Sequence, residues 1–568
     1  MTKVTTALEQ HLNDDLEQAK KDYKELLLQN PNNIDALHLL AIAYGQQGLY
    51  EQASEYLNKA LILAPKDPQL YNSKANILKR IGQIPAAITV YKTAIKLNTT
   101  NPASHYNLSL MYFNAGEYNK ATGHLELALK YNIKYIDAYH TLIHIFHIKQ
   151  QYSKAKNLIE QGYEQTQNII FYKLRGQNYA LQNLSDKAIE QYELYLAACS
   201  DDYQIHHYLA VEYLKADKAD EAAEHNLKAL KINPEHAESC HNLAVIYLTQ
   251  NKLDPALRYW MQALQQEPSN LDYLYNIGVV YNYKGLYTDA LIYFKKVLTA
   301  EPKHYNAIVN IATIYLKKYM PAEAKFFYQK ALQIKPEDSQ TKFMLAALDN
   351  SQNKFTSAPE QYVTDLFNEY ANTFDEHLTK MLHYKAPEVI YNLLIRHIDI
   401  EQKDQLICCD VGCGTGLMGE KLVSHAKELI GVDLAPKMLA KAREKSVYTK
   451  LITADVHNYL GSMPEKFDLI TAADVMPYFG DIAKVMQAAH KSLMTNGYII
   501  FTCENYADDN EHNYFLSSNA RFSHKQSYVL SVLHALNFKL ICNTQEVTRT
   551  QAKVDIKCDI YIAQKVLG

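Results

Sequence analysis

An alanine that returns at a nearly constant interval constrains this chain more than any other feature of its sequence. Neighbouring copies are 34 residues apart, except for one pair that is 33 residues apart. The ten positions are Ala19, Ala53, Ala87, Ala121, Ala155, Ala188, Ala222, Ala256, Ala290 and Ala324. A period of this length is typical of one small helical unit that is repeated and stacked on its own copies. We therefore expect a repeat array in the first part of the chain.

Each period has the internal pattern of a helical hairpin. Two apolar stripes at helical spacing flank a turn that contains glycine, and a proline closes the unit. These prolines are Pro31, Pro65, Pro234, Pro268, Pro302 and Pro336. Small residues occupy one slot of the first helix, at Ala41, Ala210, Ala244, Gly278 and Ala312. A tyrosine recurs three residues after that slot, at Tyr44, Tyr112, Tyr179, Tyr213, Tyr247, Tyr281 and Tyr315. We expect the small and large residues together to pack each hairpin against its neighbour.

The phase of these residues resembles that of tetratricopeptide repeats. We count ten units over residues 1–338: a partial unit that ends near Asn33, and nine that start at 34, 68, 102, 136, 169, 203, 237, 271 and 305. The resemblance implies an all-α right-handed superhelix whose concave groove binds a protein or peptide. Most of the 45 tyrosines then serve packing.

One slot of the repeat carries asparagine, at Asn107, Asn242, Asn276 and Asn310. Its amide both donates and accepts hydrogen bonds, so a column of asparagines can hold successive peptide units of an extended chain. The arrangement is similar to that in the repeats of O-linked N-acetylglucosamine transferase. We predict that the last three bind the partner, with solvated residues of the first helix as the alternative.

The charge balance and the cysteines narrow the class of protein. The chain has 58 basic and 62 acidic residues, a net charge of −4, which provides no basic field for nucleic acid. No apolar run approaches the roughly 20 residues of a membrane span, and the amino terminus lacks a signal-peptide pattern. The eight cysteines include no C-x-x-C pair. We expect a cytoplasmic protein with reduced thiols, no metal site, no nucleic-acid or membrane partner, and an undetermined oligomeric state.

The 34-residue period ends after residue 338, and we predict a capping helix and linker over 339–358. From 359 to 568, β-rich runs alternate with amphipathic segments. The predicted strands cover 406–411, 429–433, 450–455, 468–473, 497–504, 538–543 and 559–564. Helices between the first five favour a parallel α/β sheet, and the last two are expected to form an antiparallel hairpin at its edge.

A glycine-rich turn follows the first of these strands, in the sequence Asp410-Val-Gly412-Cys-Gly414-Thr-Gly416. Glycines there let backbone amides contact a ligand at the start of a helix. The spacing departs from the dinucleotide fingerprint, and no lysine follows as in a phosphate-binding loop. The motif resembles the first motif of class I S-adenosylmethionine-dependent methyltransferases, which implies a Rossmann-like seven-stranded domain.

This resemblance also implies roles for acids at the ends of the next strands. Asp433 would accept both ribose hydroxyls, Asp455 and Val456 would contact the adenine, and Asp410 would lie near the methionine end. Cys413, Leu434 and Ala473 complete the implied cofactor site with the three glycines.

Further segments resemble a bacterial family of predicted methyltransferases that are often fused to these repeats. They are Tyr370 to Leu378, Leu382 to Pro387, Ala473 to Asp481, and Arg521 to Tyr528. The resemblance implies the reaction class and leaves the acceptor open. The expected acceptor side has the potential catalytic residues His524, Tyr384 and Asp474, and the binding residues Tyr370, His377, Tyr478 and Arg521.

Two of these acceptor-side roles have alternatives. His524 is the best candidate for a general base, although it can instead be a structural histidine that fixes its loop. Arg521 can pair with an acidic acceptor or with a carboxylate such as Asp375.

The leading functional prediction is an S-adenosylmethionine-dependent methyltransferase whose repeat groove recruits a protein substrate or partner. One alternative is a small-molecule O-methyltransferase in which the repeats serve as an assembly scaffold. The other is a non-catalytic adaptor with a vestigial methyltransferase fold.

Overall fold

The structure is a computed structural model of the chain. It describes residues 16–349, 355–371, 374–376, 378, 382–398, 400, 405–506, 512–551 and 554–566. The chain divides into two compact units, Met1–Tyr273 and Leu274–Gly568. No helix in these described ranges is long and apolar enough to cross a lipid bilayer.

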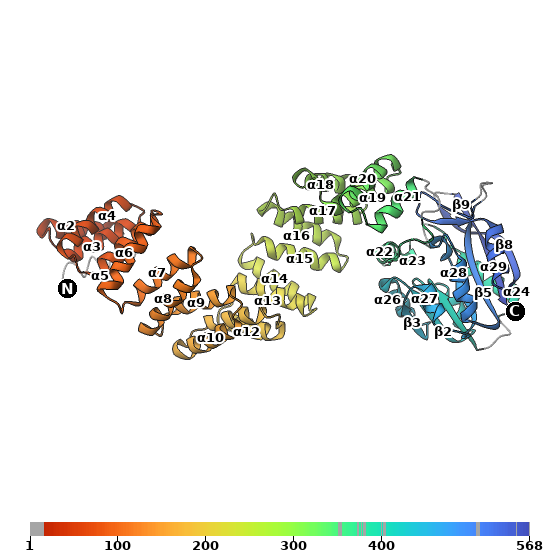
Figure 1. Cartoon of the computed structure of the whole chain (residues 1–568), viewed down its shortest axis with the longest axis horizontal. Helices are drawn as coiled ribbons and strands as arrows, with labels where there is room; N and C mark the ends of the chain where they lie inside the picture. Colours follow the sequence, from red (N-terminus) through yellow and green to blue (C-terminus); the bar gives the residue numbers. More distant parts are fainter. Residues whose placement is uncertain are drawn as a thin grey trace. The chain divides into compact units, whose positions relative to one another are not determined.

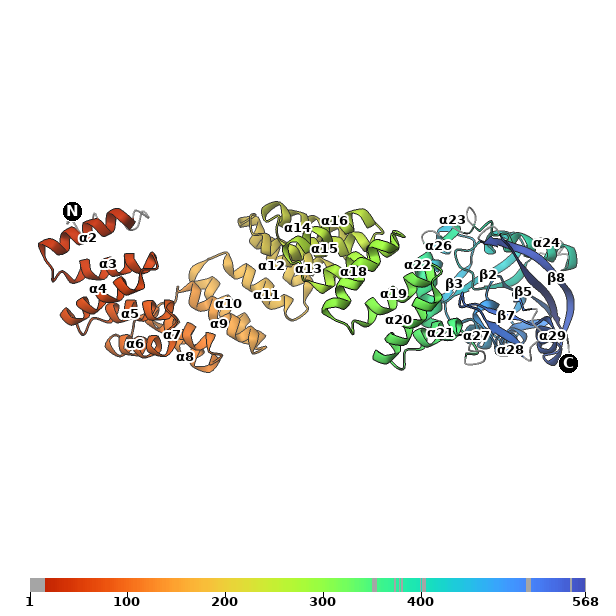
Figure 2. The same ribbon diagram turned by 90° about the horizontal axis from the view of Figure 1, so that it is seen from above.

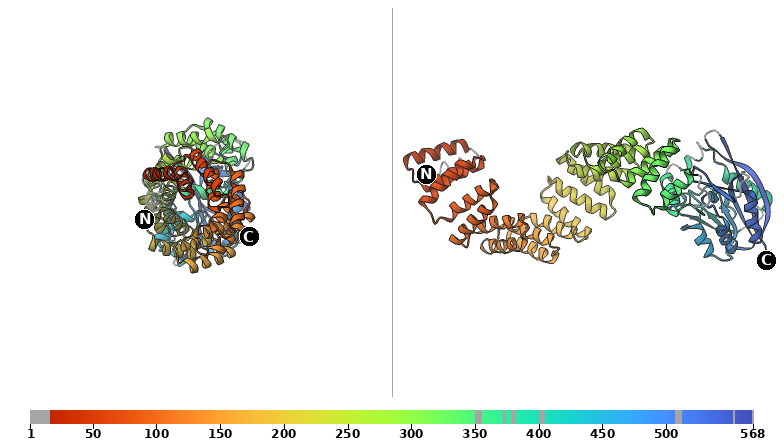
Figure 3. Two further views of the ribbon diagram at one scale, coloured as in Figure 1. Left: turned by 90° about the vertical axis from the view of Figure 1, so that its left-hand side faces the viewer. Right: turned by 45° about the horizontal axis from the view of Figure 1, so that its top comes forward.

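The first unit consists of helices that pack as antiparallel pairs (Figure 1, Figure 3). They are α2 (Leu16–Gln29), α3 (Ile34–Gln46), α4 (Tyr50–Leu63), α5 (Pro68–Arg80), α6 (Ile84–Leu97), α7 (Pro102–Asn114), α8 (Tyr118–Tyr131), α9 (Ile136–Ile148), α10 (Tyr152–Thr166), α11 (Ile170–Ala180), α12 (Ser185–Ala198), α13 (Tyr203–Lys215), α14 (Ala219–Ile232), α15 (Ala237–Thr249) and α16 (Leu253–Gln266).

The repeat pattern continues into the second unit. Its helices are α17 (Leu271–Tyr283), which spans the division, α18 (Tyr287–Ala300), α19 (Tyr305–Lys317), α20 (Pro321–Ile334) and the capping helix α21 (Ser339–Leu348). The first helix of each predicted repeat begins at the predicted residue, except α11, which begins at Ile170 instead of 169.

The repeated residues explain this regularity. All ten periodic alanines have 0% exposure, so a larger side chain has no room there. Except for Tyr179, each recurring tyrosine stacks on an aromatic ring twelve residues later, in the second helix of its own repeat. Tyr44 lies 5.6 Å from Tyr56, and Tyr247 lies 5.7 Å from Tyr259. The tyrosine therefore also fastens the two helices of one hairpin, in addition to the predicted packing between hairpins.

The described part of the second unit contains one nine-stranded sheet. The strands are β1 (Leu406–Val411), β2 (Ala426–Asp433), β3 (Lys450–Thr453), β4 (Phe467–Ala472), β5 (Leu493–Asn505), β6 (Tyr514–Leu516), β7 (Phe522–His524), β8 (Phe538–Gln551) and β9 (Val554–Lys565). Five of them run parallel in the order β3-β2-β1-β4-β5.

The remaining four strands extend this sheet beyond β5. Antiparallel β9 pairs with β5 and with β8. All seven predicted strands are present, and β8–β9 is the predicted antiparallel hairpin. The short pair β6–β7, which joins the carboxyl end of β5, was not predicted.

Alternating side chains bury both faces of the sheet. Cys408, Leu429 and Leu469 pack with α24 (Ala386–Ile398) on one face. Cys409 and Ile430 share the opposite core with α27 (Val456–Gly461), α28 (Ala483–Ser492) and α29 (Gln526–Ala535). Figure 2 shows these three helices and α24 on opposite sides of the sheet. A strand buried on both faces is typical of a doubly wound α/β domain.

Five short elements surround the carboxyl ends of the parallel strands. They are α22 (Glu360–Tyr370), α23 (Phe374–Glu376), α25 (Gly419–Leu422), α26 (Pro436–Lys445) and the 3-10 helix η3 (Met476–Tyr478).

The capping helix α21 joins the repeats to the sheet within the second unit. Phe343 of this helix is 0% exposed and packs with Phe522 of β7 and with Tyr362 of α22. Met344 and Leu345 of the same helix pack against the cluster of Tyr328 in the last repeat, and Met344 also packs against the cluster of Phe343. The last repeats and the sheet domain therefore share a continuous apolar contact.

Candidate functional site

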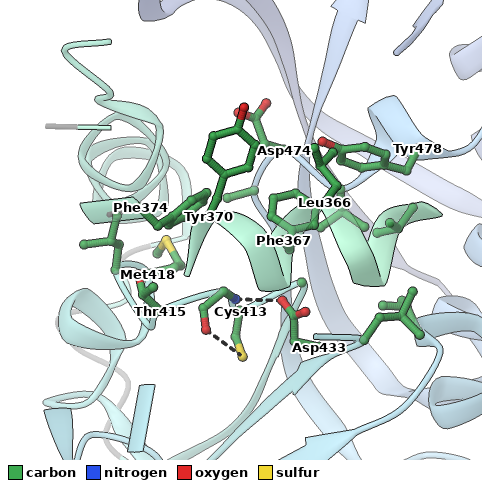
Figure 4. Close-up of a pocket in the computed structure, with 18 of the residues that line it drawn as sticks. Leu366, Phe367, Tyr370, Phe374, Cys413, Thr415, Met418, Asp433, Asp474 and Tyr478 are labelled. Carbon is green, nitrogen blue, oxygen red and sulfur yellow. Dashed lines mark hydrogen bonds between the residues drawn. The ribbon is translucent and has the colours of Figure 1, made fainter. Parts of the chain in front are cut away.

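A cavity of about 430 Å³ lies at the carboxyl ends of the parallel strands. Strand β1 has β2 on one side and β4 on the other, so the chain crosses the sheet in opposite directions here. Such a switch point is where open α/β sheets bind their ligands. Figure 4 shows the cavity between the loop after β1 and the helix α22, whose Leu366, Phe367 and Tyr370 point into it.

The glycine-rich turn forms one wall of this cavity. Gly412, Gly414 and Gly416 have φ angles of 63°, 55° and 95°, which side-chain-bearing residues rarely adopt. A Cβ atom at Gly412 would lie 2.4 Å from Val475 Cγ2. At Gly414 the nearest atom is 3.7 Å away, on Phe374, so the backbone there is open to a ligand.

Asp433 ends β2 directly opposite this turn. One carboxylate oxygen accepts a hydrogen bond from the Gly414 amide at 2.9 Å (Figure 4). The other accepts from the Ala435 amide at 2.8 Å. Burial raises the pKa of Asp433 even though these amides favour its charged form. The carboxylate is thus fixed in front of the glycine turn.

Asp410, the last acid of β1, is 1% exposed. It accepts hydrogen bonds from the Tyr448 hydroxyl at 2.6 Å and the Thr471 hydroxyl at 2.8 Å. Burial, with a smaller effect of the Asp433 charge, raises the pKa of Asp410 to about 6. Its charge therefore changes near pH 6, only slightly below neutral pH.

The ring of Tyr448 packs against the glycine-rich turn, and the sequence did not predict this role. Its ring lies where a Cβ atom at Gly416, Gly419 or Gly431 would otherwise point, at 3.0 Å, 2.4 Å and 3.0 Å. Three glycines thus make room for one tyrosine that reaches Asp410.

Asp455 and Val456 line the same cavity at the end of β3. Asp455 caps α27, and one of its oxygens accepts from the Asn458 amide at 2.9 Å. Its carboxylate is thereby fixed at the rim of the cavity.

The opposite end of the cavity holds a cluster of four charged side chains, which we call the arginine cluster: Asp474, Glu504, Arg521 and Arg549. Glu504 accepts from Arg521 Nε at 2.7 Å and from Arg549 Nη2 at 2.5 Å. Asp474 accepts from Arg549 Nη1 at 3.0 Å and from Arg521 Nη2 at 3.5 Å. Although burial opposes it, the two arginine charges lower the pKa of Glu504.

Tyrosines surround the arginine cluster. The Tyr478 hydroxyl accepts from Arg521 Nη1 at 3.2 Å, and the guanidinium lies 5.4 Å from the centre of that ring. Burial raises the phenol pKa of both Tyr478 and Tyr384. Both rings line the cavity and remain protonated at neutral pH.

The alternative partner predicted for Arg521 is not the one found. Asp375 instead accepts from the Thr415 hydroxyl and lies 3.0 Å from Lys445 Nζ. Glu504 and Arg549 were missed because they lie on β5 and β8, far along the sequence from the motifs.

The structure brings most predicted site residues to this one cavity. The lining residues among them are Tyr370, Tyr384, Asp410, Gly412, Cys413, Gly414, Asp433, Leu434, Asp455, Val456, Ala473, Asp474, Tyr478 and Arg521. Gly416 is in the same turn but outside the lining, and His377 lies outside the described residues.

His524 is placed differently from the prediction of a catalytic base. It is 1% exposed and is absent from the described lining of the cavity. Its Nε2 atom lies 2.7 Å from the Phe479 carbonyl oxygen and 3.2 Å from that of Gly480, so Nε2 carries the proton and donates it. Burial lowers its pKa to about 4. This geometry favours the alternative, a neutral histidine that holds the loop after η3.

The predicted asparagines lie on the first helices of three repeats. Asn242 on α15 has an amide nitrogen with no hydrogen-bond partner among the described residues. The amide nitrogen of Asn310 on α19 donates to the Tyr275 hydroxyl at 3.1 Å and to the Asn306 carbonyl at 2.9 Å. Asn276 lies on α17. The three side chains therefore do not share one environment.

Comparisons with known families match both halves of the chain. A family model described as "Methyltransferase domain" matches residues 409–501. Tetratricopeptide repeat models match residues 11–77, 75–116, 241–305 and 305–338.

Individual curated relatives match part of the chain. Nodulation protein S of Sinorhizobium fredii is 34% identical over 98 residues, which are 16% of this chain and 44% of that protein. Ubiquinone biosynthesis O-methyltransferase of Hydrogenovibrio crunogenus is 30% identical over 146 residues, 24% of this chain and 58% of that protein. The chain thus spans about half the length of these curated relatives.

A solved structure is also similar. Magnesium protoporphyrin IX methyltransferase from Synechocystis with bound S-adenosylhomocysteine is 16% identical, with a TM-score of 0.29. The match covers 36% of this chain and 99% of that structure.

Proposed function

We propose that this chain, in which tetratricopeptide repeats are joined to a methyltransferase domain, transfers a methyl group from S-adenosylmethionine to an acceptor. We further propose that the repeat array recruits a protein, as substrate or as partner. The observation that carries the proposal is the single cavity that holds the glycine turn at one end and the arginine cluster at the other.

The residues present fit an adenosyl cofactor. The open backbone at Gly414 and the fixed carboxylate of Asp433 offer a cradle in which ribose hydroxyls can replace the Gly414 amide as donors to that carboxylate. Asp455 and Val456 would hold the adenine, and Asp410 would attract the ammonium of the methionine end. When bound, the cofactor supplies a methyl group activated by a positively charged sulfur.

The chain's own residues then orient the acceptor and exclude water. Helix α22 covers the cavity with Val363, Leu366, Phe367 and Tyr370, which share one face at spacings of three and four residues. Tyr384, Asp474, Tyr478 and Arg521 line the end that remains for the acceptor.

Recruitment of a protein is supported by the nature of the array. Repeats of this kind form extended surfaces that bind other chains. The asparagines add no support to this part of the proposal, because the unpartnered amide nitrogen of Asn242 is buried and that of Asn310 already donates within the fold.

A small-molecule acceptor is the second candidate. Its support is the similarity to an O-methyltransferase of ubiquinone biosynthesis. In this case the repeats would serve as a scaffold for assembly.

One experiment tests the proposal and separates the two candidates. The full chain is incubated with methyl-labelled S-adenosylmethionine and an extract of the cells that produce it, and the products are divided into protein, nucleic acid and small molecules. We expect label in the protein fraction, and a fragment starting at Leu274 should lose that transfer while it still binds the cofactor. Label confined to small molecules, with undiminished turnover by the fragment, would favour the scaffold role. The absence of any transfer would refute the proposal.

A further inference from the structure

The most informative feature that the proposed reaction leaves unexplained is the pair of arginines at the acceptor end of the cavity. Arg521 and Arg549 come from opposite sides of β5, the first from the loop before β7 and the second from β8. Their side chains are only 18% and 7% exposed. Two guanidinium groups are costly to bury, so their presence beside a ligand cavity calls for a chemical reason.

The contacts inside the cluster hold both guanidinium groups in place. Glu504 makes the shortest contacts, at 2.7 Å to Arg521 and 2.5 Å to Arg549, and so fixes both guanidinium groups. Asp474 is held more loosely, at 3.0 Å and 3.5 Å. Two cations and two anions leave the cluster neutral, so a negative ligand meets no net repulsion.

The arginines retain hydrogen-bonding capacity toward the cavity. A guanidinium group has five N–H donors. Among the described residues, the contacts above and the bond to Tyr478 use three donors of Arg521 and two of Arg549. Arginine pairs with carboxylates through two parallel bonds, and both residues line the cavity.

The described residues that contact the two arginines offer no ready proton acceptor. The described lining residues include no histidine or lysine. Tyr384 and Tyr478 are protonated phenols with raised pKa values, and both oxygens of Asp474 accept from arginine. Such a site suits an acceptor that is already ionised at neutral pH.

We propose that the methyl acceptor is a carboxylate, held by Arg521 and Arg549, and that the product is a methyl ester. This inference rests on the proposed methyl transfer. An oxygen of the carboxylate forms the new C–O bond, the C–S bond of the donor breaks, and its electron pair stays on sulfur. The negative charge of the carboxylate and the positive charge of the sulfonium disappear together, and no proton moves. A base is therefore unnecessary, which agrees with the position of His524 outside the cavity lining.

Alkali distinguishes this product from other methylated products. Carboxyl methyl esters release methanol in mild alkali, whereas methyl groups on nitrogen, sulfur or ether oxygen remain attached. The full chain is incubated with methyl-labelled S-adenosylmethionine and cell extract, and the protein and small-molecule fractions are treated separately with alkali. We expect volatile labelled methanol from one fraction, which identifies the source of the carboxylate. Transfer of label that resists alkali would overturn the inference and leave the methyltransferase proposal intact. If no label is transferred, both fall.

Substitution of Arg549 tests whether this residue holds the carboxylate acceptor. Arg549→Met should reduce methanol-releasing product at least about tenfold, while calorimetry shows unchanged S-adenosylmethionine affinity. Because loss of one arginine leaves a buried acid unpaired, the double variant Arg549→Met with Asp474→Asn keeps the cluster neutral and should show the same loss. Arg443→Met, at an exposed arginine of α26, is the matched control. Ester formation at the wild-type rate in the single or the double Arg549 variant would overturn the assignment. So would a loss of cofactor binding that accompanies the loss of ester formation.

Discussion

At the scale of single residues, Asp410 is the group whose charge sets the character of the cofactor end. Tyr448 and Thr471 donate to its two oxygens and burial encloses it, so its pKa of about 6 lies well above the usual value of an aspartate. It is the one acid of the glycine motif that a modest change of pH can neutralise.

The raised pKa of Asp410 predicts that cofactor binding depends on pH. The raised pKa means that Asp410 is neutral below about pH 6 and ionised above it. Only the ionised form attracts the cationic methionine end, so we expect affinity for S-adenosylmethionine to fall by up to about tenfold per pH unit below pH 6, and to level off above it. Calorimetry from pH 5 to 8 measures this change.

Asp410→Asn is the control for that dependence. It should bind more weakly at pH 8 and lose most of the slope, with a residual part from Asp433, whose pKa is also raised. An equal slope in the variant would show that another group titrates.

The same scale shows what the sequence could and could not predict. Glycines and acids that follow strands carry a local pattern, so Gly412 and Gly414 could be found from their spacing, and Asp433 from the methyltransferase resemblance that this spacing carries. Tyr448 and Arg549 lie in no such motif, because their roles come from side chains that cross between elements. Three glycines packed on one ring were the available signal for Tyr448, and they can be recognised only in three dimensions.

At the scale of elements, helix α22 connects three parts of the second unit. Its inner face lines the cavity, Asn368 accepts from the Lys437 amide of α26 at 3.1 Å, and Glu369 lies 3.3 Å from Lys317 of α19. The helix therefore contacts both the proposed cofactor site and the last repeat.

Phe367→Ala tests the role of this helix. The ring lies 5.5 Å from that of Tyr478 and 6.0 Å from that of Phe374, and it packs against Met438. Two aromatic contacts contribute about 1–3 kcal/mol together, so we expect S-adenosylmethionine binding about 5 to 150 times weaker by calorimetry. Glu369→Gln, on the other side of the helix, should bind normally. If binding is weakened in the control instead, α22 affects cofactor binding through the ion pair of Glu369 with Lys317.

The strands show where sequence patterns end. The predicted strand over 538–543 extends in the structure to Gln551. Its second half is mostly polar, and it is held as a strand because it pairs with β9. That extension carries Arg549 to the cavity. Because this polar part of the edge strand lacks alternating apolar residues, the sequence pattern predicted a strand end at 543.

At the scale of the whole molecule, the change in sequence pattern and the division of the structure fall at different places. The repeat period ends at 338, whereas the compact units meet at Tyr273 and Leu274. The predicted boundary follows sequence periodicity, while packing joins the last repeats to the sheet domain through α21. The predicted domain limits stay a prediction for that reason.

Phe343→Ala tests this junction. The ring is 0% exposed and lies 5.3 Å from both Phe355 and Tyr362. Truncation of a buried phenylalanine costs about 3–5 kcal/mol, so we expect a lower unfolding temperature of the second unit by calorimetric scanning. Phe326→Ala, at a ring 61% exposed in α20, should change it little. Equal stability of Phe343→Ala and wild type would mean that α21 is not part of this core.

The central claim is that the cavity behind the glycine turn binds S-adenosylmethionine, and titration calorimetry of the full chain tests it most directly. We predict one site in the wild type and at least about tenfold weaker binding in Gly414→Asp, because the new carboxylate faces Asp433 from a left-handed backbone position. Gly461→Asp, where a Cβ atom meets nothing within 4 Å, should bind as the wild type does. No binding by the wild type, or full affinity in Gly414→Asp, would contradict the account.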